Sequence, residues 1–287
     1  MSRIAYVNGR YVPLRNAFVN VEDRGFQFAD GVYEVFPVYA GRIVNGDWHM
    51  QRLAQSLQGL RIEWPISSRI VSAILPEILR RNRITAGGMI YLQITRGASP
   101  RNHMFPGAAV PPTLVLIARP VNMAARHAQA QTGVRVITVP ETRWTRRDIK
   151  SVALLPNMLA KQRAAEAGAA EALFVNDRGI VTECAASTFW IIRADGSLMT
   201  HPLGHDILPG VTRRAVLALA GEMGLKVVEQ EFGLPEAMAA REAFLTSATN
   251  FVMPVTQIDA QIIGNGAPGA QSMALRQAYI AKLEKIY

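Results

Sequence analysis

The pattern that most constrains the fold is a succession of short apolar segments, each ended by turn residues. Asn8-Gly9 separates two strand-like segments, 4–7 and 10–12, and Ala40-Gly41 separates two more. An Asn-Gly pair between two such segments is a strong signal for a tight β-hairpin. The first part of the chain therefore predicts two β-hairpins.

Two helices are predicted after these hairpins. Asp47 can cap the first, and Ser67 or Ser68 can open the second, because short polar side chains accept hydrogen bonds from the first N–H groups of a helix. Alternating apolar residues then predict strands at 89–95 and 113–118. The first half is therefore strand-rich, with two helices grouped in its middle.

The segment 121–133 is rich in Ala, Gln and Asn and has weak periodicity, which favours a linker. Beyond it, predicted strands alternate with helices up to a C-terminal helix. We therefore expect an α+β protein of two domains. Residues 1–120 would form a small N-terminal domain, 121–133 the interdomain linker, and 134–287 a larger C-terminal domain.

Composition narrows the classes of protein. The chain has 287 residues, 49% hydrophobic and 18% charged, which excludes disorder. Its 31 Lys and Arg against 22 Asp and Glu give a net charge of +9, which favours anionic partners such as nucleic acid or small carboxylates and phosphates. A single cysteine, Cys184, and an N-terminus without the apolar core of a signal peptide predict a cytoplasmic protein with no membrane segment.

Two motifs resemble ligand-binding sites, but their sequence context argues against a dinucleotide site and a metal site. The segment 264–269 matches G-x-G-x-x-G, but the chain ends before a βαβ unit could follow, so a turn before the last helix is expected. His201 and His205 are four residues apart, but Pro202 and Gly204 place them in a loop. The histidine spacing therefore predicts no metal site.

Lys150 differs from the other four lysines in its surroundings. It lies between a charged loop, 143–148, and an abruptly apolar run, 152–155. Burial and the nearby charges of Arg146 and Arg147 would lower its pKa and leave the amine available as a nucleophile. An ordinary surface lysine is the alternative.

Two further features complement such an amine. Glu183 precedes an apolar strand at 189–192, where a carboxylate needs a cationic partner, either a pyridinium nitrogen or an arginine. The segment 207–212 leads into a helix whose first N–H groups can hold a phosphate, although it could also be a simple helix start. An amine, a pyridinium partner and a phosphate site are what pyridoxal phosphate requires.

Several runs of sequence carry a family resemblance. The segments EDRGFQFADGVYEVF, YLQITRGASPRNHMFP, RRDIKSVALLPNMLAKQRA and LPGVTR resemble the D-amino-acid transaminases of the class IV pyridoxal-phosphate-dependent family. The likeness runs from about residue 3 to residue 285. It implies a fold-type IV enzyme with a small N-terminal α+β domain and a larger, β-barrel-like α+β C-terminal domain. It also implies a homodimer, with pyridoxal 5'-phosphate bound between the domains.

The resemblance also implies roles for individual residues in binding the cofactor. Lys150 would form the Schiff base and move the substrate proton, and Glu183 would pair with the pyridinium nitrogen. The phosphate would be held by Arg52 and by the backbone at Val211, Thr212 and Ala248. Residues 184–186 and Ala248 depart from the family, which often has hydroxyl side chains at these positions.

The motif Ser-Pro-Arg-Asn-His at 99–103 is the most discriminating part of the resemblance. It implies that Arg101 and His103 reach across the dimer and, with Tyr33, bind the substrate carboxylate. The expected activity is transamination between D-amino acids such as D-alanine and 2-oxo acids such as 2-oxoglutarate. The alternatives are a branched-chain L-amino-acid or (R)-amine transaminase, and a basic nucleic-acid-binding protein.

Overall fold

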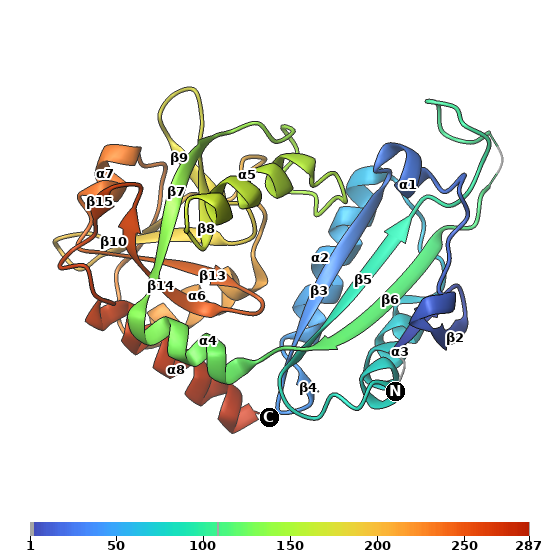
Figure 1. Ribbon diagram of the computed structural model, residues 1–287, viewed down its shortest axis with the longest axis horizontal. Helices are drawn as coiled ribbons and strands as arrows, with labels where there is room; N and C mark the ends of the chain where they lie inside the picture. Colours follow the sequence, from blue (N-terminus) through green and yellow to red (C-terminus); the bar gives the residue numbers. More distant parts are fainter. Residues whose placement is uncertain (1–2, 108, 287) are drawn as a thin grey trace. The chain divides into compact units, whose positions relative to one another are not determined.

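The computed structural model describes residues 3–107 and 109–286, which fall into two compact units (Figure 1). The first unit contains the described residues up to Asn122 together with Ile149–Ala153. The second contains Met123–Asp148 and Leu154–Ile286. The chain thus passes into the second unit, returns briefly to the first at 149–153, and leaves it again.

The first unit is built on a six-stranded antiparallel sheet with the order β2-β1-β6-β5-β3-β4. Its strands are β1 (Ile4–Val7), β2 (Arg10–Pro13), β3 (Gly31–Tyr39), β4 (Arg42–Ile43), β5 (Gly88–Thr95) and β6 (Thr113–Pro120). Both expected hairpins are present. The second turns at Ala40 and Gly41, which have positive φ angles of 47° and 75°.

Helices cover one face of this sheet. The helices of the unit are α1 (Arg24–Phe28), α2 (Gly46–Leu60) and α3 (Ser68–Arg81), with a short 3-10 helix at Leu14–Asn16. Alternate residues of β3 and β5, such as Phe36 and Leu92, are fully buried in one core with α2 and α3. Ser67 caps α3 as expected, but α2 begins at Gly46, so Asp47 lies inside its first turn instead of capping it.

The second unit contains a larger, mixed sheet with the order β12-β11-β10-β13-β14-β7-β8-β9. The strand β7 runs parallel to β8 and β14, and β11 runs parallel to β12. Because β9, at one end of this order, also contacts β10, the sheet is curled. Its strands are β7 (Val134–Pro140), β8 (Glu171–Val175), β9 (Val181–Cys184), β10 (Thr188–Ile192), β11 (Leu198–Thr200), β12 (Val227–Glu229), β13 (Glu242–Ser247), β14 (Phe251–Ile258) and, paired to β14, β15 (Gln261–Ile262).

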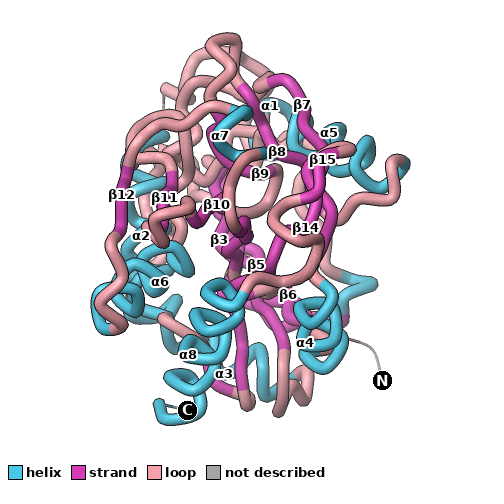
Figure 2. Tube along the Cα trace, turned by 90° about the vertical axis from the view of Figure 1, so that its left-hand side faces the viewer, coloured by secondary structure: helices cyan, strands magenta, loops and turns pink. Residues whose placement is uncertain are grey.

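Helices surround this sheet (Figure 2). They are α4 (Met123–Thr132), α5 (Leu155–Glu166), α6 (Val211–Glu222), α7 (Leu234–Met238) and α8 (Ala270–Ile286). The long helix α8 contacts β13, β14 and α6, while α5 contacts β7 and β8. None of the helices in the described part of the chain is long and apolar enough to cross a membrane. Both units combine sheet and helix, which confirms the expected α+β class.

The structure differs from the expected linker at 121–133. Residues 123–132 form the helix α4, which belongs to the second unit. Only Ala130 of this helix is buried, so an amphipathic pattern is hardly visible in the sequence. The alanine and glutamine content that suggested a linker is also favourable for a helix, and here the helix forms.

Candidate functional site

Lys150 lies in the short segment Ile149–Ala153, which belongs to the first unit although the residues on both sides of it belong to the second. Its carbonyl accepts a hydrogen bond from the N–H of Tyr33 at 2.9 Å, and its own N–H donates to Ser56 Oγ at 3.1 Å. The preceding residue, Ile149, is buried against α2, where a Cβ on Gly59 would approach Ile149 Cδ1 to 2.7 Å. These contacts hold the Lys150 backbone in one place.

The side chain of Lys150 meets a small aromatic cluster. Its Nζ donates to the hydroxyl of Tyr33 at 3.2 Å and lies 4.3 Å from the centre of that ring. The Tyr33 ring stacks on Tyr91, whose hydroxyl donates to Gln93 Oε1 at 2.7 Å. Burial, together with the neighbouring Tyr33, raises the pKa of Tyr91 to about 12, so this phenol stays protonated at neutral pH. The Lys150 amine therefore lies against the stacked pair of Tyr33 and Tyr91.

The two arginines that the sequence suggested as neighbours of Lys150 are paired with acids. Arg146 binds Asp148 at 2.9 Å, and Arg147 binds Asp206 at 2.5 Å. Both arginines are therefore paired with carboxylates, and the side-chain partner of Lys150 is Tyr33.

Arg52, the expected phosphate ligand, is held on α2 by a buried carboxylate. Its Nε and Nη2 donate to the two oxygens of Glu34 at 2.9 and 2.6 Å. His49, one turn earlier on the helix, lies 3.0 Å from Glu34 Oε1 through its Nδ1. Burial alone would raise the pKa of Glu34, but Arg52 and His49 lower it far below its usual value. Glu34 therefore fixes the orientation of the Arg52 guanidinium.

Arg101 and His103 lie in an exposed loop after β5. The Arg101 guanidinium is 4.5 Å from the centre of the Phe28 ring, and the His103 ring lies 5.4 Å from the same ring. Arg24 approaches Phe28 at 4.8 Å, and its Nη1 donates to the carbonyl of Asn102 at 2.6 Å. Among the described residues, neither Arg101 nor His103 contacts Tyr33. Within one chain, Arg101 and His103 thus share contacts with the Phe28 ring.

Glu183 lies on β9 in the second unit, where an arginine holds it. Arg143 Nη1 donates to Glu183 Oε1 at 2.5 Å, and the N–H of Leu208 approaches both carboxylate oxygens at 3.2 and 3.3 Å. Glu183 is 5% exposed. Of the two cationic partners that the sequence left open, the arginine is present, and the carboxylate is therefore stabilised in its charged form.

A second acid sets the position of Arg143. Glu141 accepts from Arg143 Nε at 3.0 Å and from Nη2 at 2.6 Å, while Thr182 Oγ1 donates to Glu141 at 2.9 Å. Burial alone would raise the pKa of Glu141, but the hydrogen bonds and charge of Arg143 lower it. Burial would lower the pKa of Arg143, yet both carboxylates raise it, so the guanidinium keeps its charge.

The N-terminus of α6 lies in the same unit as Glu183. Its N-cap, Gly210, provides no side-chain cap, so the first turn at Val211 and Thr212 presents its N–H groups without one. A Cβ on Gly210 would approach Thr188 Oγ1 to 2.9 Å. Thr188 of β10 pairs with Thr246 of β13, two residues before Ala248 in the turn to β14. This pairing brings the turn at Ala248 toward the start of α6.

These two groups of residues suit pyridoxal phosphate. A lysine amine beside a phenol, a buried carboxylate in its charged form, an arginine with a fixed orientation and an uncapped helix N-terminus are the donors and acceptors that the cofactor needs. Lys150, Tyr33 and Arg52 belong to the first unit, and Glu183 and the start of α6 belong to the second.

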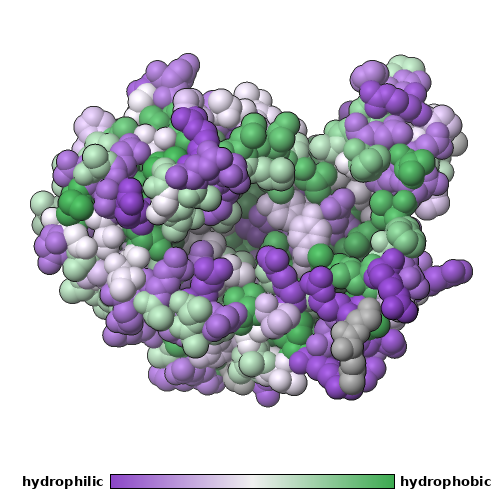
Figure 3. Space-filling view, viewed as in Figure 1, coloured by the Kyte–Doolittle hydropathy of each residue, from purple (hydrophilic) through white to green (hydrophobic). Residues whose placement is uncertain are grey.

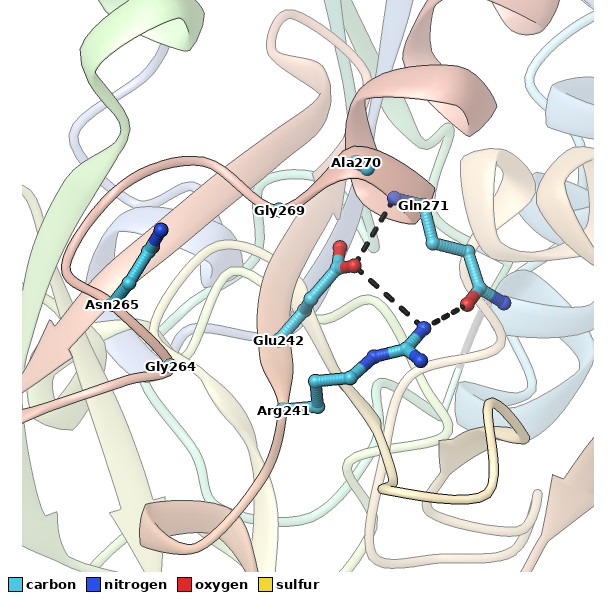
Figure 4. A pocket seen from close by; sticks show the side chains of 7 residues that line it. All are labelled: Arg241, Glu242, Gly264, Asn265, Gly269, Ala270 and Gln271. Atoms are coloured by element: carbon cyan, nitrogen blue, oxygen red, sulfur yellow. Dashed lines mark hydrogen bonds and ion pairs between the residues drawn. The ribbon is translucent and has the colours of Figure 1, made fainter.

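The glycine-rich segment 264–269 has a structural role. It follows the β14–β15 hairpin and leads into α8, beside a pocket that Glu242 faces (Figure 4). Glu242 accepts hydrogen bonds from the N–H groups of Gln271 and Ser272 at 3.1 and 2.8 Å. A carboxylate already occupies this helix N-terminus, so a dinucleotide phosphate would be repelled, in agreement with the turn expected from the sequence.

Several neighbours of the site were missed in the sequence. Glu34 and His49 are the partners of Arg52, and Arg143 and Glu141 are the partners of Glu183. Glu34 is adjacent to Tyr33 in β3, and a lone acid in an otherwise apolar strand was the signal that could have found it. No comparable local signal marks Arg143, which is one of several arginines in its loop.

Comparisons with known proteins agree with this geometry. The family described as amino-transferase class IV matches residues 31–258. A D-alanine aminotransferase of Bacillus licheniformis is 41% identical over 262 residues, covering 91% of this chain and 90% of the relative. One from Listeria monocytogenes serotype 4b is 38% identical, covering 96% and 95%. Among solved structures, a branched-chain amino acid aminotransferase from T.th., with pyridoxamine 5'-phosphate, has a TM-score of 0.88 at 26% identity, covering 98% and 93%. The chain therefore belongs to the class IV family of pyridoxal-phosphate-dependent aminotransferases.

Proposed function

We propose that this protein transfers the amino group of D-amino acids such as D-alanine to 2-oxo acids such as 2-oxoglutarate. The observation that carries the proposal is the contact between Lys150 Nζ and the Tyr33 hydroxyl at 3.2 Å. It places the amine that would move the substrate proton beside the phenol that would help to bind the substrate carboxylate. The D-alanine aminotransferases among its relatives support the choice of D-amino acids.

Different residues of the chain act as the base and bind the substrate carboxylate. Lys150 acts as the base for the proton on the substrate's α-carbon, because its amine is the one held beside Tyr33. Tyr33, Arg101 and His103 bind the substrate carboxylate. A carboxylate held on one side leaves only one enantiomer with its α-hydrogen directed at Lys150, so these three residues set the handedness of the substrate.

Other residues hold the cofactor. Pyridoxal 5'-phosphate, when bound, supplies the sink for the electrons of the broken C–H bond. Glu183 stabilises the protonated ring nitrogen, and Arg143 keeps that carboxylate charged and in place. Arg52 and the backbone at Val211, Thr212 and Ala248 bind the phosphate, with the Arg52 guanidinium oriented by Glu34.

The same proposal includes a homodimer. Hydrophobic side chains are exposed on the surface of both units (Figure 3). Phe18 and Phe26 of the first unit are 77% and 76% exposed, and Leu155, Met158 and Leu159 of α5 are each at least 60% exposed. Exposed apolar side chains of this size support an interface with a second copy of the chain. A partner subunit would bring its own Arg101 and His103 to the Tyr33 of this chain. With its single cysteine buried and unpaired, the enzyme suits the reducing cytoplasm.

The test is a comparison of amino donors on the purified enzyme. With 2-oxoglutarate as acceptor, D-alanine should be used in preference to L-alanine, L-leucine and an (R)-arylalkylamine. Preference for L-leucine would favour the branched-chain alternative, which the structural likeness to a branched-chain enzyme makes worth testing. Preference for the amine would show that the carboxylate site is misassigned.

A further inference from the structure

Three potential metal ligands meet where two parallel strands of the second unit end. β11 and β12 run parallel, with Thr200 beside Glu229, so the residues that follow each strand lie close together. His201 follows β11 directly, and Glu231 comes two residues after β12. Asp206 joins them from the loop that leads to α6. One nitrogen of His201 and one oxygen of each acid all lie within 4.8 Å of one another.

The surroundings of the two ring nitrogens of His201 suit a metal ligand. The residue is 3% exposed, and its Nδ1 lies 2.9 Å from the carbonyl of Pro202. A carbonyl only accepts hydrogen bonds, so Nδ1 carries the proton and Nε2 carries the lone pair. Nε2 is buried and has no hydrogen-bond partner among the described residues. Metal-binding histidines commonly donate their other ring N–H to a carbonyl in this way.

The two acids leave space beside this nitrogen. Their side chains are 45% and 37% exposed, for Asp206 and Glu231 respectively. Arg147 donates to Asp206 Oδ1 at 2.5 Å, and Arg178 donates to Glu231 Oε1 at 2.8 Å. In the described part of the chain, each arginine side chain hydrogen-bonds to one carboxylate oxygen, which leaves the second oxygen of each acid available for a metal. Neither acid forms an ion pair with His201 itself in the described residues.

We propose that His201, Asp206 and Glu231 bind one divalent transition-metal ion, best represented by Zn²⁺. One imidazole nitrogen and two carboxylate oxygens suit zinc, whereas Mg²⁺ prefers ligands that are all oxygen. Zinc bonds of about 2.0–2.2 Å place tetrahedral ligands about 3.4 Å apart. The three ligand atoms lie within 4.8 Å of one another, and the partly exposed side chains of the two acids permit them to adopt this spacing. Water completes the coordination.

Charged and backbone groups beside the three ligands lead to two further expectations about metal binding. Arg178 is 60% exposed and competes with the metal for Glu231, so removing its charge should strengthen metal binding. Asp206 lies two residues before Leu208, whose N–H contacts Glu183. A bound ion would therefore fix the loop between β11 and α6 and raise the melting temperature of the protein.

The experiment is a calorimetric titration of Zn²⁺ into the untagged, full-length enzyme loaded with its cofactor and stripped of metals with a chelator. We expect one ion per chain, and no saturable heat with Mg²⁺. His201→Gln, Asp206→Asn and Glu231→Gln should each weaken binding by about tenfold or more. Should His201→Gln fail to fold, the two partly exposed acids still decide the result.

Matched variants control for binding elsewhere on the surface. His205→Gln removes an exposed histidine of the same loop, and Glu236→Gln removes an exposed acid of α7; both should leave the zinc affinity unchanged. Arg178→Gln should tighten it and enlarge the rise in melting temperature. Absence of saturable binding would mean that only water occupies this space. Binding that survives in Asp206→Asn and Glu231→Gln would also overturn the proposal.

Discussion

At the scale of single residues, the position of Lys150 is set by its backbone. Tyr33 and Ser56 hold that backbone through hydrogen bonds that do not involve the lysine side chain. Lys150→Ala should therefore keep the fold while abolishing transamination, because the base is lost. The measurement is activity with D-alanine together with the visible absorption of the lysine-bound cofactor, and both should disappear. Unaltered activity would rule out Lys150 as the catalytic amine.

Glu183 offers a test of charge without a change of shape. Glu183→Gln removes the negative charge that would stabilise the protonated ring nitrogen, so proton removal should slow far more than substrate binding weakens. Single-turnover kinetics separate the two effects. Arg143→Lys is a useful comparison, because it keeps a positive charge but loses the bidentate contact with Glu141. A normal single-turnover rate in Glu183→Gln would mean that another carboxylate has this role.

Glu34 is a buried acid whose partners lower its pKa. Such a group stabilises the folded protein at pH values above the ordinary pKa of a carboxyl group, and this contribution is lost as the pH falls toward the lower, folded-state pKa. Glu34→Gln leaves Arg52 buried without its charge partner and should cost about 3 kcal/mol at neutral pH. The free energies of unfolding of the variant and the wild type, measured in urea, should differ less in acid than at neutral pH.

The control for Glu34 is an acid with a lowered pKa on the surface. Glu77 pairs with Arg80 and Arg81, which lower its pKa to about 2, but these arginines are largely exposed to solvent. Glu77→Gln should leave the urea midpoint at neutral pH nearly unchanged, because solvent screens such pairs. Equal effects of the two substitutions would show that burial of Glu34 contributes nothing.

At the scale of elements, some local signals predicted the structure and others did not: α2 begins before Asp47, and the expected linker contains the helix α4. The hairpin at Asn8-Gly9 and the cap at Ser67 depend on neighbouring residues, and both are present. The strand β14 contains Pro254, a residue that normally argues against a central strand. It forms because β13 and β7 supply pairing on both sides, which the sequence of the strand does not reveal.

Two glycines of α6, its N-cap Gly210 and Gly221 near its end, have opposite surroundings. A Cβ on Gly210 would approach Thr188 Oγ1 to 2.9 Å, whereas Gly221 has open space around it. Gly210→Ala should shift the first turn of α6 and weaken cofactor binding, measured by fluorescence titration of the apoenzyme. Gly221→Ala should leave that affinity unchanged and stabilise the helix by about 1 kcal/mol. Equal cofactor affinity in both variants would separate the start of α6 from the phosphate site.

At the scale of the whole molecule, the sequence indicated candidate site residues but not the residues that hold them. Local context and family resemblance pointed to Lys150, Glu183 and Arg52, whose roles remain predictions. The Arg52 partner Glu34 lies 18 residues away, and the Glu183 partner Arg143 lies 40 residues away. Such pairs arise only once the strands are assembled, so a single sequence without its fold does not show them.

Arg101 raises a question that involves two copies of the chain. Within one chain it lies against Phe28 and has no described contact with Tyr33. A charge-assisted hydrogen bond contributes about 1.5–3 kcal/mol. Arg101→Ala should therefore weaken use of D-alanine by roughly ten- to a hundredfold, with a much smaller effect on amines that lack a carboxylate.

Hybrid dimers decide which subunit Arg101 serves. Two differently tagged chains, one with Lys150→Ala and one with Arg101→Ala, can be produced together and the mixed dimers purified through both tags. If Arg101 acts across the interface, one site of each mixed dimer combines an intact lysine with an intact arginine, and about half of the wild-type activity should return. If Arg101 acts within its own chain, both sites lack one group and activity stays at the level of the single variants. That second result would refute the proposed role of the partner subunit, while a monomer in solution would refute the dimer itself.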